Sequence, residues 1–321
     1  MRSREVRAPV STAGSMISRE RRGDILIMPS RSRGIPRELV ALLRPHHWVK
    51  NIFVLLPLLL TPAALTWEAA GAALMGVAAF CAVASAVYVM NDYMDREADR
   101  RHPSKRFRPL ASGAVPVALA LPTMGLLLAG GLAIGSLLTG PFVFLLGTYF
   151  AINVGYSMGL KDIPIVDVLI VALGFILRVE AGASLIGVAT TQWITIMTGL
   201  LALLLALGKR RDDVVNSRDT SHRSSLAGYN KPFLDNVMTA VLGALLVTYI
   251  IYTTDPAVAA RIETGYLFYT TPLVAAGIMR YLQLLFVETR SSDPTEVLLN
   301  DRVLQGTILG WALCFGLLLY A

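Results

Sequence analysis

The segment NDYMDREADRRHPSKRFRPLASG, residues 91–113, is densely charged and lies within a very apolar chain. Hydrophobic residues make up 55% of the 321 positions and charged residues only 16%, yet this one segment holds four acids and six bases. The apolar runs that it interrupts decide the fold class. Its own charges indicate a site, because Asp92, Asp95 and Asp99 are spaced i, i+3, i+7 and would share one face of a helix.

Apolar runs of about 20 residues recur on both sides of this segment, and each is long enough to cross a ~30 Å hydrocarbon core as a helix. Alternation typical of membrane strands is absent. The sequence therefore predicts an all-α polytopic membrane protein with nine transmembrane helices. The predicted spans are Trp48–Leu65, Ala69–Met90, Val115–Leu138, Pro141–Leu160, Ile163–Ile186, Thr191–Leu207, Leu234–Tyr252, Tyr266–Phe286 and Val303–Tyr320.

The orientation follows from the distribution of Lys and Arg. Basic residues gather before the first span and in the loops after the second and sixth, whereas the loops at the other end hold only Arg261. Basic loops face the cytoplasm, so the N-terminus is predicted inside and the C-terminus outside. This topology accounts for most of the net charge of +7, so nucleic acid is not expected as a partner. Residues 1–35 are predicted to be a disordered, basic cytoplasmic tail, and residues 36–321 form the membrane domain.

The aspartate face predicts a metal site. Like charges that share a helix face repel one another unless a cation lies between them. Carboxylates without His or Cys are hard oxygen ligands that suit Mg²⁺, an ion usually shared with substrate phosphates. The alternative is a solvated helix end whose acids pair with Arg96 and Arg100.

Further polar residues occur at the same end of other predicted spans. They are Lys50 near the start of the first span, Tyr156 and Lys161 at the end of the fourth, Lys209, Arg210 and Asp213 after the sixth, and Asp301 before the ninth. Arg178 and Glu180 lie within the fifth span, so they are expected to face the bundle interior, as an ion pair or as part of a polar cavity. Carboxylates, a divalent cation and many bases together are the chemistry of a pyrophosphate site.

At these residues the chain resembles the UbiA superfamily of membrane prenyltransferases. The superfamily signature N-D-x-x-D-x-x-x-D after the second helix is matched by Asn91, Asp92, Asp95 and Asp99, and the Tyr/Lys motif after the fourth helix by Tyr156 and Lys161. The resemblance covers roughly Pro36 to the C-terminus. It implies a nine-helix fold with its site at the cytoplasmic face of the cell membrane.

One branch of the superfamily, the decaprenyl-phosphate phosphoribosyltransferases, is similar over several shorter stretches. These are RPHHWVKN, residues 91–113, YSMGLK, GKRRDD and NDRVLQ. The second superfamily motif, D-x-x-x-D after helix six, is replaced here by Lys209, Arg210, Arg211, Asp212 and Asp213. The branch resemblance implies Mg²⁺-dependent transfer of 5-phosphoribosyl from phosphoribosyl pyrophosphate (PRPP) to a polyprenyl phosphate, with release of pyrophosphate.

This resemblance and the charge chemistry assign roles to particular residues. Asp92, Asp95 and Asp99 are expected to hold Mg²⁺, with Lys50 and Lys161 as further catalytic groups. The expected substrate contacts are Asn91, Lys105, Arg106, Arg108, Tyr156, Arg178, Lys209, Arg210, Asp213 and Asp301. The expected partners are PRPP, the lipid phosphate and the bilayer. The sequence leaves the oligomeric state open, and a homo-oligomer is one of the states that it allows.

Two other functions remain open from the sequence. The enzymatic alternative is transfer of a prenyl group from a prenyl diphosphate to an aromatic or other small acceptor, which uses the same metal–diphosphate chemistry. The non-enzymatic alternative is a transporter, because polar residues within spans also mark ion paths. A transporter is disfavoured, since most of the charge lies at one end of the spans rather than across the midplane.

Overall fold

The computed structural model describes residues 34–216, 224–262, 264–288, 297 and 300–320. All regular structure within these ranges is helical. The predicted tail lies outside the described residues except for its last two positions, Gly34 and Ile35.

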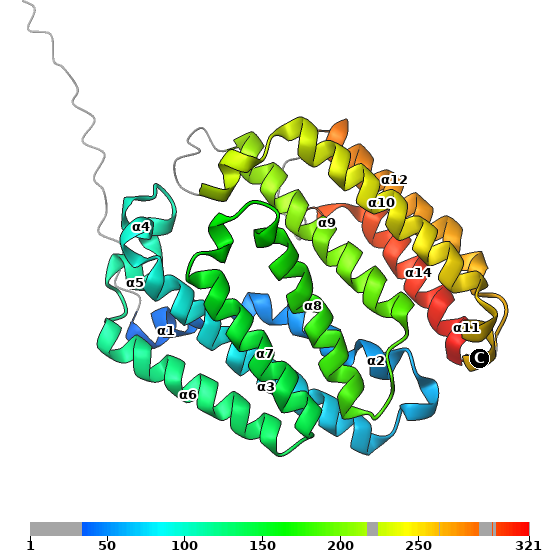
Figure 1. The fold of residues 1–321 in the computed structure, drawn as a ribbon, viewed down its shortest axis with the longest axis horizontal. Coiled ribbons are helices and arrows are strands. Elements are labelled where there is room, and N and C mark those ends of the chain that lie inside the picture. Colours follow the sequence, from blue (N-terminus) through cyan, green and yellow to red (C-terminus); the bar gives the residue numbers. More distant parts are fainter. Residues whose placement is uncertain (1–33, 217–223, 263, 289–296, 298–299, 321) are drawn as a thin grey trace, which may run out of the picture. The chain divides into compact units, whose positions relative to one another are not determined.

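The helices of the described residues follow one another along the chain as Figure 1 shows. The first part of the chain forms α1 (Ile35–Leu43), η1 (Pro45–Leu55), α2 (Leu56–Leu59), η2 (Pro62–Ala64), α3 (Trp67–Met94), α4 (Arg96–Arg101), η3 (Lys105–Phe107), α5 (Pro109–Ser112) and α6 (Val117–Ser136). The rest forms α7 (Gly140–Ser157), η4 (Leu160–Asp162), α8 (Val166–Leu185), α9 (Gln192–Asn216), η6 (Ser224–Gly228), α10 (Lys231–Thr254), α11 (Pro256–Arg261), η7 (Leu267–Thr270), α12 (Thr271–Phe286) and α14 (Arg302–Tyr320).

Six helices of the described residues are long and apolar enough to cross a membrane: α3, α6, α8, α9, α10 and α14. The multi-pass, all-helical class predicted from the sequence is therefore confirmed. Two more predicted spans coincide with α7 and α12, which have only 18 and 16 residues. The total of nine spans and the cytoplasmic N-terminus stay predictions.

The first predicted span, Trp48–Leu65, is not one α-helix. It begins within the 3₁₀ helix η1, continues through the four residues of α2 and ends after η2. Prolines explain the breaks, because Pro45, Pro57 and Pro62 lack the backbone N–H that a continuous helix would use, and their rings clash with the preceding turn. The element that enters the bundle first is therefore a 3₁₀ helix for most of its length.

Close backbone approaches fix this first element against the bundle. A Cβ on Gly182 of α8 would lie 2.0 Å from the carbonyl oxygen of Val54, so only glycine lets η1 pack there. On the other side, the indole N–H of Trp48 donates to Ser85 of α3, whose hydroxyl donates to the carbonyl oxygen of Leu43. The start of the membrane domain is thus held between α3 and α8.

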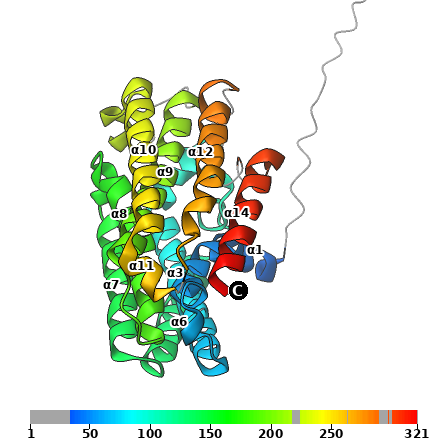
Figure 2. The ribbon, with the colours of Figure 1, turned by 90° about the vertical axis from the view of Figure 1, so that its right-hand side faces the viewer.

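The remaining helices pack mostly against their sequence neighbours, as Figures 1 and 2 show. α3 packs against α6 and α7, α8 against α7 and α9, α10 against α9 and α12, and α12 against α14. Phe80, Phe142 and Leu146 are fully buried between α3 and α7. Since successive long helices reverse direction, the ends of α3, α7 and α9 meet the starts of α8 and α10 at one end of the bundle, which carries the charged motifs.

Candidate functional site

The three aspartates of the motif lie on one nearly continuous helical run. Asp92 belongs to the last turn of α3, Asp95 separates α3 from α4, and Asp99 lies in α4. The backbone N–H of Asp99 still donates to the carbonyl oxygen of Asp95 at 2.8 Å, so the turn continues through the junction. Asp92 and Asp99 are buried. The predicted helix face of acids is confirmed.

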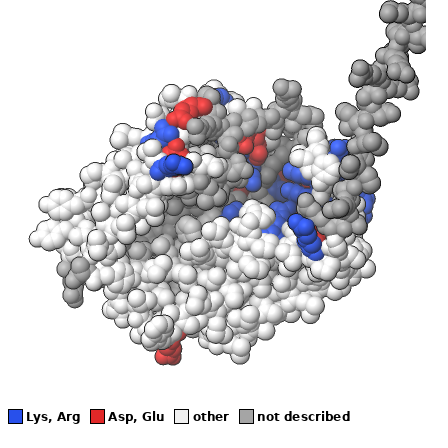
Figure 3. Space-filling view, turned by 180° about the vertical axis from the view of Figure 1, so that it is seen from behind, with Lys and Arg blue, Asp and Glu red and all other residues white. Residues whose placement is uncertain are grey.

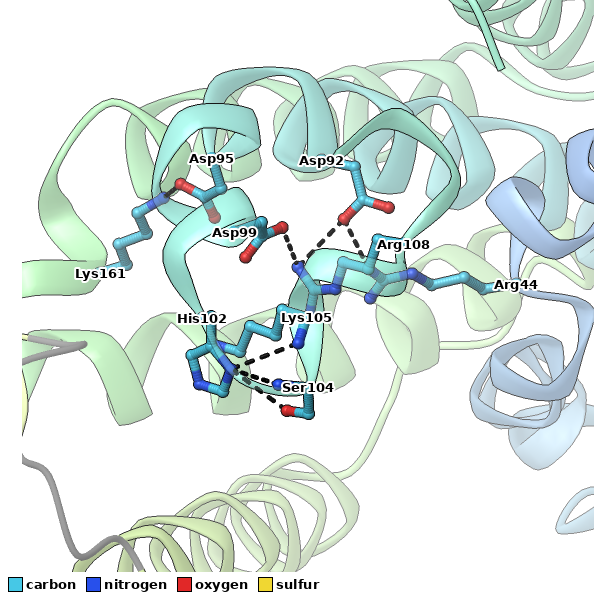
Figure 4. Close-up of polar contacts among 9 residues, drawn as sticks. All are labelled: Arg44, Asp92, Asp95, Asp99, His102, Ser104, Lys105, Arg108 and Lys161. Carbon is cyan, nitrogen blue, oxygen red and sulfur yellow. Dashed lines mark hydrogen bonds and ion pairs between the residues drawn. The ribbon is translucent and has the colours of Figure 1, made fainter. Parts of the chain in front are cut away.

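Basic side chains from three other segments neutralise these acids (Figure 4). Arg108 bridges two of them, with Nη1 2.7 Å from Asp99 Oδ2 and 3.2 Å from Asp92 Oδ1. Arg44 reaches the same Asp92 oxygen at 2.5 Å, from a left-handed backbone position (φ 53°) between α1 and η1. Lys161, after α7, forms an ion pair with Asp95. The aspartates are thus neutralised by distant bases.

The alternative to a metal site was a solvated helix end whose acids pair with Arg96 and Arg100. In the structure this pairing involves Glu97 and not the three aspartates. Arg96 and Arg100 pair with Glu97, at 3.0 and 2.9 Å. Hydrogen bonding to Arg96, and then the charge of Arg100, lowers the pKa of Glu97. Glu97 therefore forms the solvated pairs, whereas Asp92 and Asp99 face inward.

The donor set suits a divalent cation, although the carboxylates do not converge as ligands. Within the described ranges no group of three His, Cys, Asp or Glu side chains is arranged to hold a metal ion. However, the guanidinium of Arg108 lies between Asp92 and Asp99, and so supplies positive charge where a cation shared by them would lie. Hard oxygen donors around that position fit Mg²⁺ in type.

A polar cavity of about 170 Å³ opens beside the motif. It is lined by four of the expected site residues, namely Lys50 of η1, Asn91 of α3, Tyr156 of α7 and Arg178 of α8. Asn91 accepts a hydrogen bond from Ser157, which ties the motif to the end of α7. The structure therefore brings together residues that are widely separated in the sequence.

Arg178 forms the buried wall of this polar cavity. Its Nε donates to Asn51 Oδ1 at 2.8 Å, Nη1 to the carbonyl oxygen of Gly174 at 2.7 Å and Nη2 to the Tyr149 hydroxyl at 3.0 Å. Glu180 does not pair with it, but accepts hydrogen bonds from Thr190 and Thr195. Of the two arrangements expected for Arg178, the polar cavity is confirmed and the ion pair with Glu180 is wrong. The residues point apart because positions i and i+2 of a helix do not face each other.

A second group of bases lies around His47, just before the first predicted span. Burial, and then the positive charge of Lys50, lowers the pKa of His47 to about 3. The positive charges of His46, Arg44 and Lys209 lower the pKa of His47 further, with Lys209 of α9 contributing least. Figure 3 shows Lys and Arg gathered in a recess on one side of the molecule.

Arg210, the neighbour of Lys209, is buried in a separate cluster. Its Nε lies 2.6 Å from Asp167 Oδ2 and its Nη1 2.9 Å from Asp213 Oδ2. Asp167 is fully buried and also accepts a hydrogen bond at 2.6 Å from Tyr229. Burial, and then this bond, raises the pKa of the Tyr229 hydroxyl to about 12. The cluster joins α8, α9 and the segment after η6.

The other expected residues lie in varied surroundings. Lys105 is in η3, where its backbone N–H donates to His102 Nδ1, as Figure 4 shows. Arg106 is exposed, with its guanidinium 4.8 Å from the ring centre of Phe107. Asp301 pairs with Arg280 at 2.6 Å and accepts a hydrogen bond from the N–H of Leu304 in the first turn of α14.

Two residues outside the expected set belong to the site, Arg44 and Asn51. Arg44 neutralises Asp92, and Asn51 orients Arg178. Both lie near Lys50 at the start of the first predicted span, in the stretch RPHHWVKN, but only Lys50 of this stretch was assigned a role from the sequence. Their role depends on contacts across 48 and 127 positions, which no local pattern reveals.

Comparisons with known proteins agree with this arrangement. The UbiA prenyltransferase family matches residues 51–300. A protein of Corynebacterium glutamicum named decaprenyl-phosphate phosphoribosyltransferase is 33% identical, over 88% of this chain and 86% of that protein. A protein of the same name from Mycolicibacterium smegmatis is 34% identical, over 89% of this chain and 95% of that protein.

Solved structures share the fold. A UbiA homolog from Archaeoglobus fulgidus bound to DMAPP and Mg²⁺ has a TM-score of 0.66 at 20% identity, over 87% of this chain and 98% of that one. The same protein bound to GPP and Mg²⁺ has a TM-score of 0.64 at 18% identity, over 88% of this chain and all of that one.

Proposed function

Because this chain belongs to the UbiA prenyltransferase family, we propose that it transfers 5-phosphoribosyl from PRPP to a polyprenyl phosphate and releases pyrophosphate. The observation that carries the proposal is the match, over nearly the whole length of both chains, to transferases named for phosphoribosyl transfer to decaprenyl phosphate. The excess of bases around the acidic motif supports it, because PRPP presents a 5-phosphate in addition to its pyrophosphate.

The reaction needs stabilisation of a leaving group more than activation of a nucleophile. An oxygen of the lipid phosphate attacks C1 of the ribose as the bond from C1 to the pyrophosphate oxygen breaks, and the electron pair leaves with pyrophosphate. The acceptor is already an anion, so no proton has to be removed from it. The protein's task is to hold the two phosphorylated substrates in line and to stabilise the negative charge that develops on pyrophosphate.

The described residues divide this task between them. Asp92, Asp95 and Asp99 would hold Mg²⁺, which would neutralise charge on the pyrophosphate and so make it a better leaving group. Arg108 would exchange its carboxylate partners for phosphate oxygens, since a guanidinium binds either group through two parallel hydrogen bonds. Lys161 would do the same as a point charge.

The second phosphate end of PRPP requires positive charge across the polar cavity. Lys50 lines that cavity, and Lys209 lies near His47 on the same side of the bundle. Both belong to elements other than the acidic motif, so a ribose could lie between them and the metal. Arg210 would act indirectly, because its guanidinium is already engaged by two carboxylates.

The acceptor tail has a separate place in the bundle. An apolar groove of about 340 Å³ lies between the first element and the helices α9, α10, α12 and α14. The Tyr320 hydroxyl of α14 donates to the carbonyl oxygen of Leu59 at 2.8 Å, which joins α14 to the first element. We place the phosphate ends at the cytoplasmic face, since the basic loops lie there by the positive-inside rule.

Labelled PRPP tests the proposal directly. Membranes that contain the chain are incubated with PRPP labelled in the ribose, decaprenyl phosphate and Mg²⁺, and the organic phase is examined for label. The expected result is a labelled lipid that is absent with Asp92→Asn. Prenyl transfer is the competing function, and it would instead give a prenylated aromatic product from a prenyl diphosphate while no ribose label enters the lipid phase.

A further inference from the structure

Three cavities follow one another along the first element. Lys50 lines the polar cavity, Phe53 and Leu56 line the apolar groove, and Thr61 lines a third cavity of about 300 Å³ at the other end of the bundle from the acidic motif. We name this third cavity the outer pocket. Side chains at i and i+3 eclipse in a 3₁₀ helix, so Lys50 and Phe53 lie in one row along η1.

The apolar groove and the outer pocket form one continuous hollow, and the polar cavity adjoins the groove across an aromatic pair. The apolar groove and the outer pocket share Leu60, Ile194 and Tyr252 as lining residues. At the other end, the ring of Phe53 meets that of Phe175, which lines the polar cavity, with the centres 5.0 Å apart. A long, thin molecule with an anionic head would therefore pass the aromatic pair and continue through the groove toward the outer pocket.

The far end of this path is polar and negatively charged. The indole N–H of Trp193 donates to Asp255 Oδ2 at 2.8 Å, and both residues line the outer pocket. This bond and the backbone N–H of Ala257 lower the pKa of Asp255, so the carboxylate is ionised at neutral pH. A hydrocarbon chain that extended further would have to displace the indole from its charged partner, which leaves a polar group without its hydrogen bond.

We propose that the outer pocket receives the distal end of the acceptor's polyprenyl chain, and that Ile194, Trp193 and Asp255 limit the length of chain that fits. This inference rests on the proposed function, because it takes a polyprenyl phosphate as the acceptor. The position of the groove beside the cation-lined polar cavity favours this occupant, since a lipid with an anionic head would place its phosphate in the polar cavity and its tail in the groove.

Shape, rather than hydrophobic burial, sets the preference for length. The tail leaves a bilayer whose interior is as apolar as the groove, so each added isoprene unit gains little from the transfer. Filling the junction between the groove and the outer pocket should therefore harm long acceptors and spare short ones. A short chain ends before the junction and meets no obstacle.

The experiment compares decaprenyl phosphate with farnesyl phosphate as acceptors for labelled PRPP. Ile194→Trp fills the junction, and Ile250→Trp is the matched control, because Ile250 on α10 is 40% exposed and does not line the groove. Ile194→Trp should lower the ratio of kcat/KM for decaprenyl over farnesyl phosphate by about tenfold or more, the usual scale of overpacking. Ile250→Trp should leave the ratio unchanged.

Each remaining outcome is decisive. If Ile194→Trp stays active and loses activity equally on both acceptors, or loses none on either, the tail does not reach the junction and the inference is overturned. If Ile194→Trp is inactive with both acceptors, Trp193→Ala decides, because the added space should raise the decaprenyl-to-farnesyl ratio and an unchanged ratio overturns the inference. A wild-type chain that labels neither lipid overturns the proposed function itself, and the inference with it.

Discussion

Removal of the Asp167 carboxylate should be among the most damaging single changes to the charged end of the bundle. Asp167 is fully buried, and its two oxygens accept hydrogen bonds from Arg210, Tyr229 and Ser225. The Tyr229 hydroxyl in turn accepts the N–H of Ile165, a residue with a positive φ of 71°. One carboxylate thus anchors three segments.

The expected cost follows from these contacts. Asp167→Ala leaves Arg210, itself 4% exposed, with Asp213 as its remaining ion-pair partner, and breaking a buried ion pair costs about 3 to 5 kcal/mol. Asp167→Asn keeps one acceptor oxygen but turns an amide NH₂ toward a hydroxyl or guanidinium donor. Its cost should be about 1 to 3 kcal/mol, the range for one buried group left without its hydrogen bond.

The assay is the free energy of unfolding in mixed detergent micelles titrated with a denaturing detergent. Lys231→Ala is the control, since Lys231 is 52% exposed and its partner Asp235 keeps Arg211. An exposed i, i+4 pair contributes at most about 1 kcal/mol. Asp167→Ala should lose the most stability, Asp167→Asn less, and the control the least. Equal free energies of unfolding for the three variants would show that the ion pair between Asp167 and Arg210 does not stabilise the fold. Our reasoning about the buried Arg210 would then be wrong.

Three further predictions concern the acidic motif. Asp92→Asn should abolish transfer to lipid while the amount of protein in the membrane is unchanged, which immunoblotting of membranes measures; normal turnover at limiting Mg²⁺ would contradict the metal assignment. Arg108→Ala should raise the KM for PRPP far more than Arg106→Ala does. The reason is that Arg108 bridges Asp92 and Asp99, whereas Arg106 is exposed. Similar KM values for the two variants would indicate a general electrostatic role for both arginines. Mg²⁺ should tighten PRPP binding by about 5- to 150-fold in calorimetry, the usual range of coupling between two ligands; equal affinities with and without Mg²⁺ would separate the two sites.

Much of the charged end could be predicted from spacing. The i, i+3, i+7 pattern places Asp92, Asp95 and Asp99 on one helix face, and the structure confirms that face because local hydrogen bonding continues through Asp95. Lys161 was expected near the acids because it follows a neighbouring span, and it pairs with Asp95. The helical period and the predicted positions of helix ends were therefore enough to predict that these residues lie close together.

Residues whose role depends on helix rotation could not be assigned in this way. Lys209 and Arg210 are adjacent, so their side chains point about 100° apart around α9. The sequence does not say which of them is buried, and the structure buries Arg210 in ion pairs with Asp167 and Asp213. Contact of either residue with the donor stays a prediction. Arg44 shows the same limit, because a base before an apolar run looks like a topology signal until the fold brings it to Asp92.

The mixture of acids and bases in residues 91–113 has a single physical explanation. Metal alone would have to separate Arg108 from Asp92 and Asp99 and leave a guanidinium without a partner. A phosphorylated donor alone would take the guanidinium of Arg108 and leave the buried Asp99 carboxylate without that ion pair, although Asp92 would keep Arg44. When metal and donor enter together, the metal takes the carboxylates and the phosphates take the bases, so every charge keeps a partner. We therefore expect metal and donor to bind more tightly together than either does alone, because Arg108 and Asp99 each keep a charged partner only when both ligands are present.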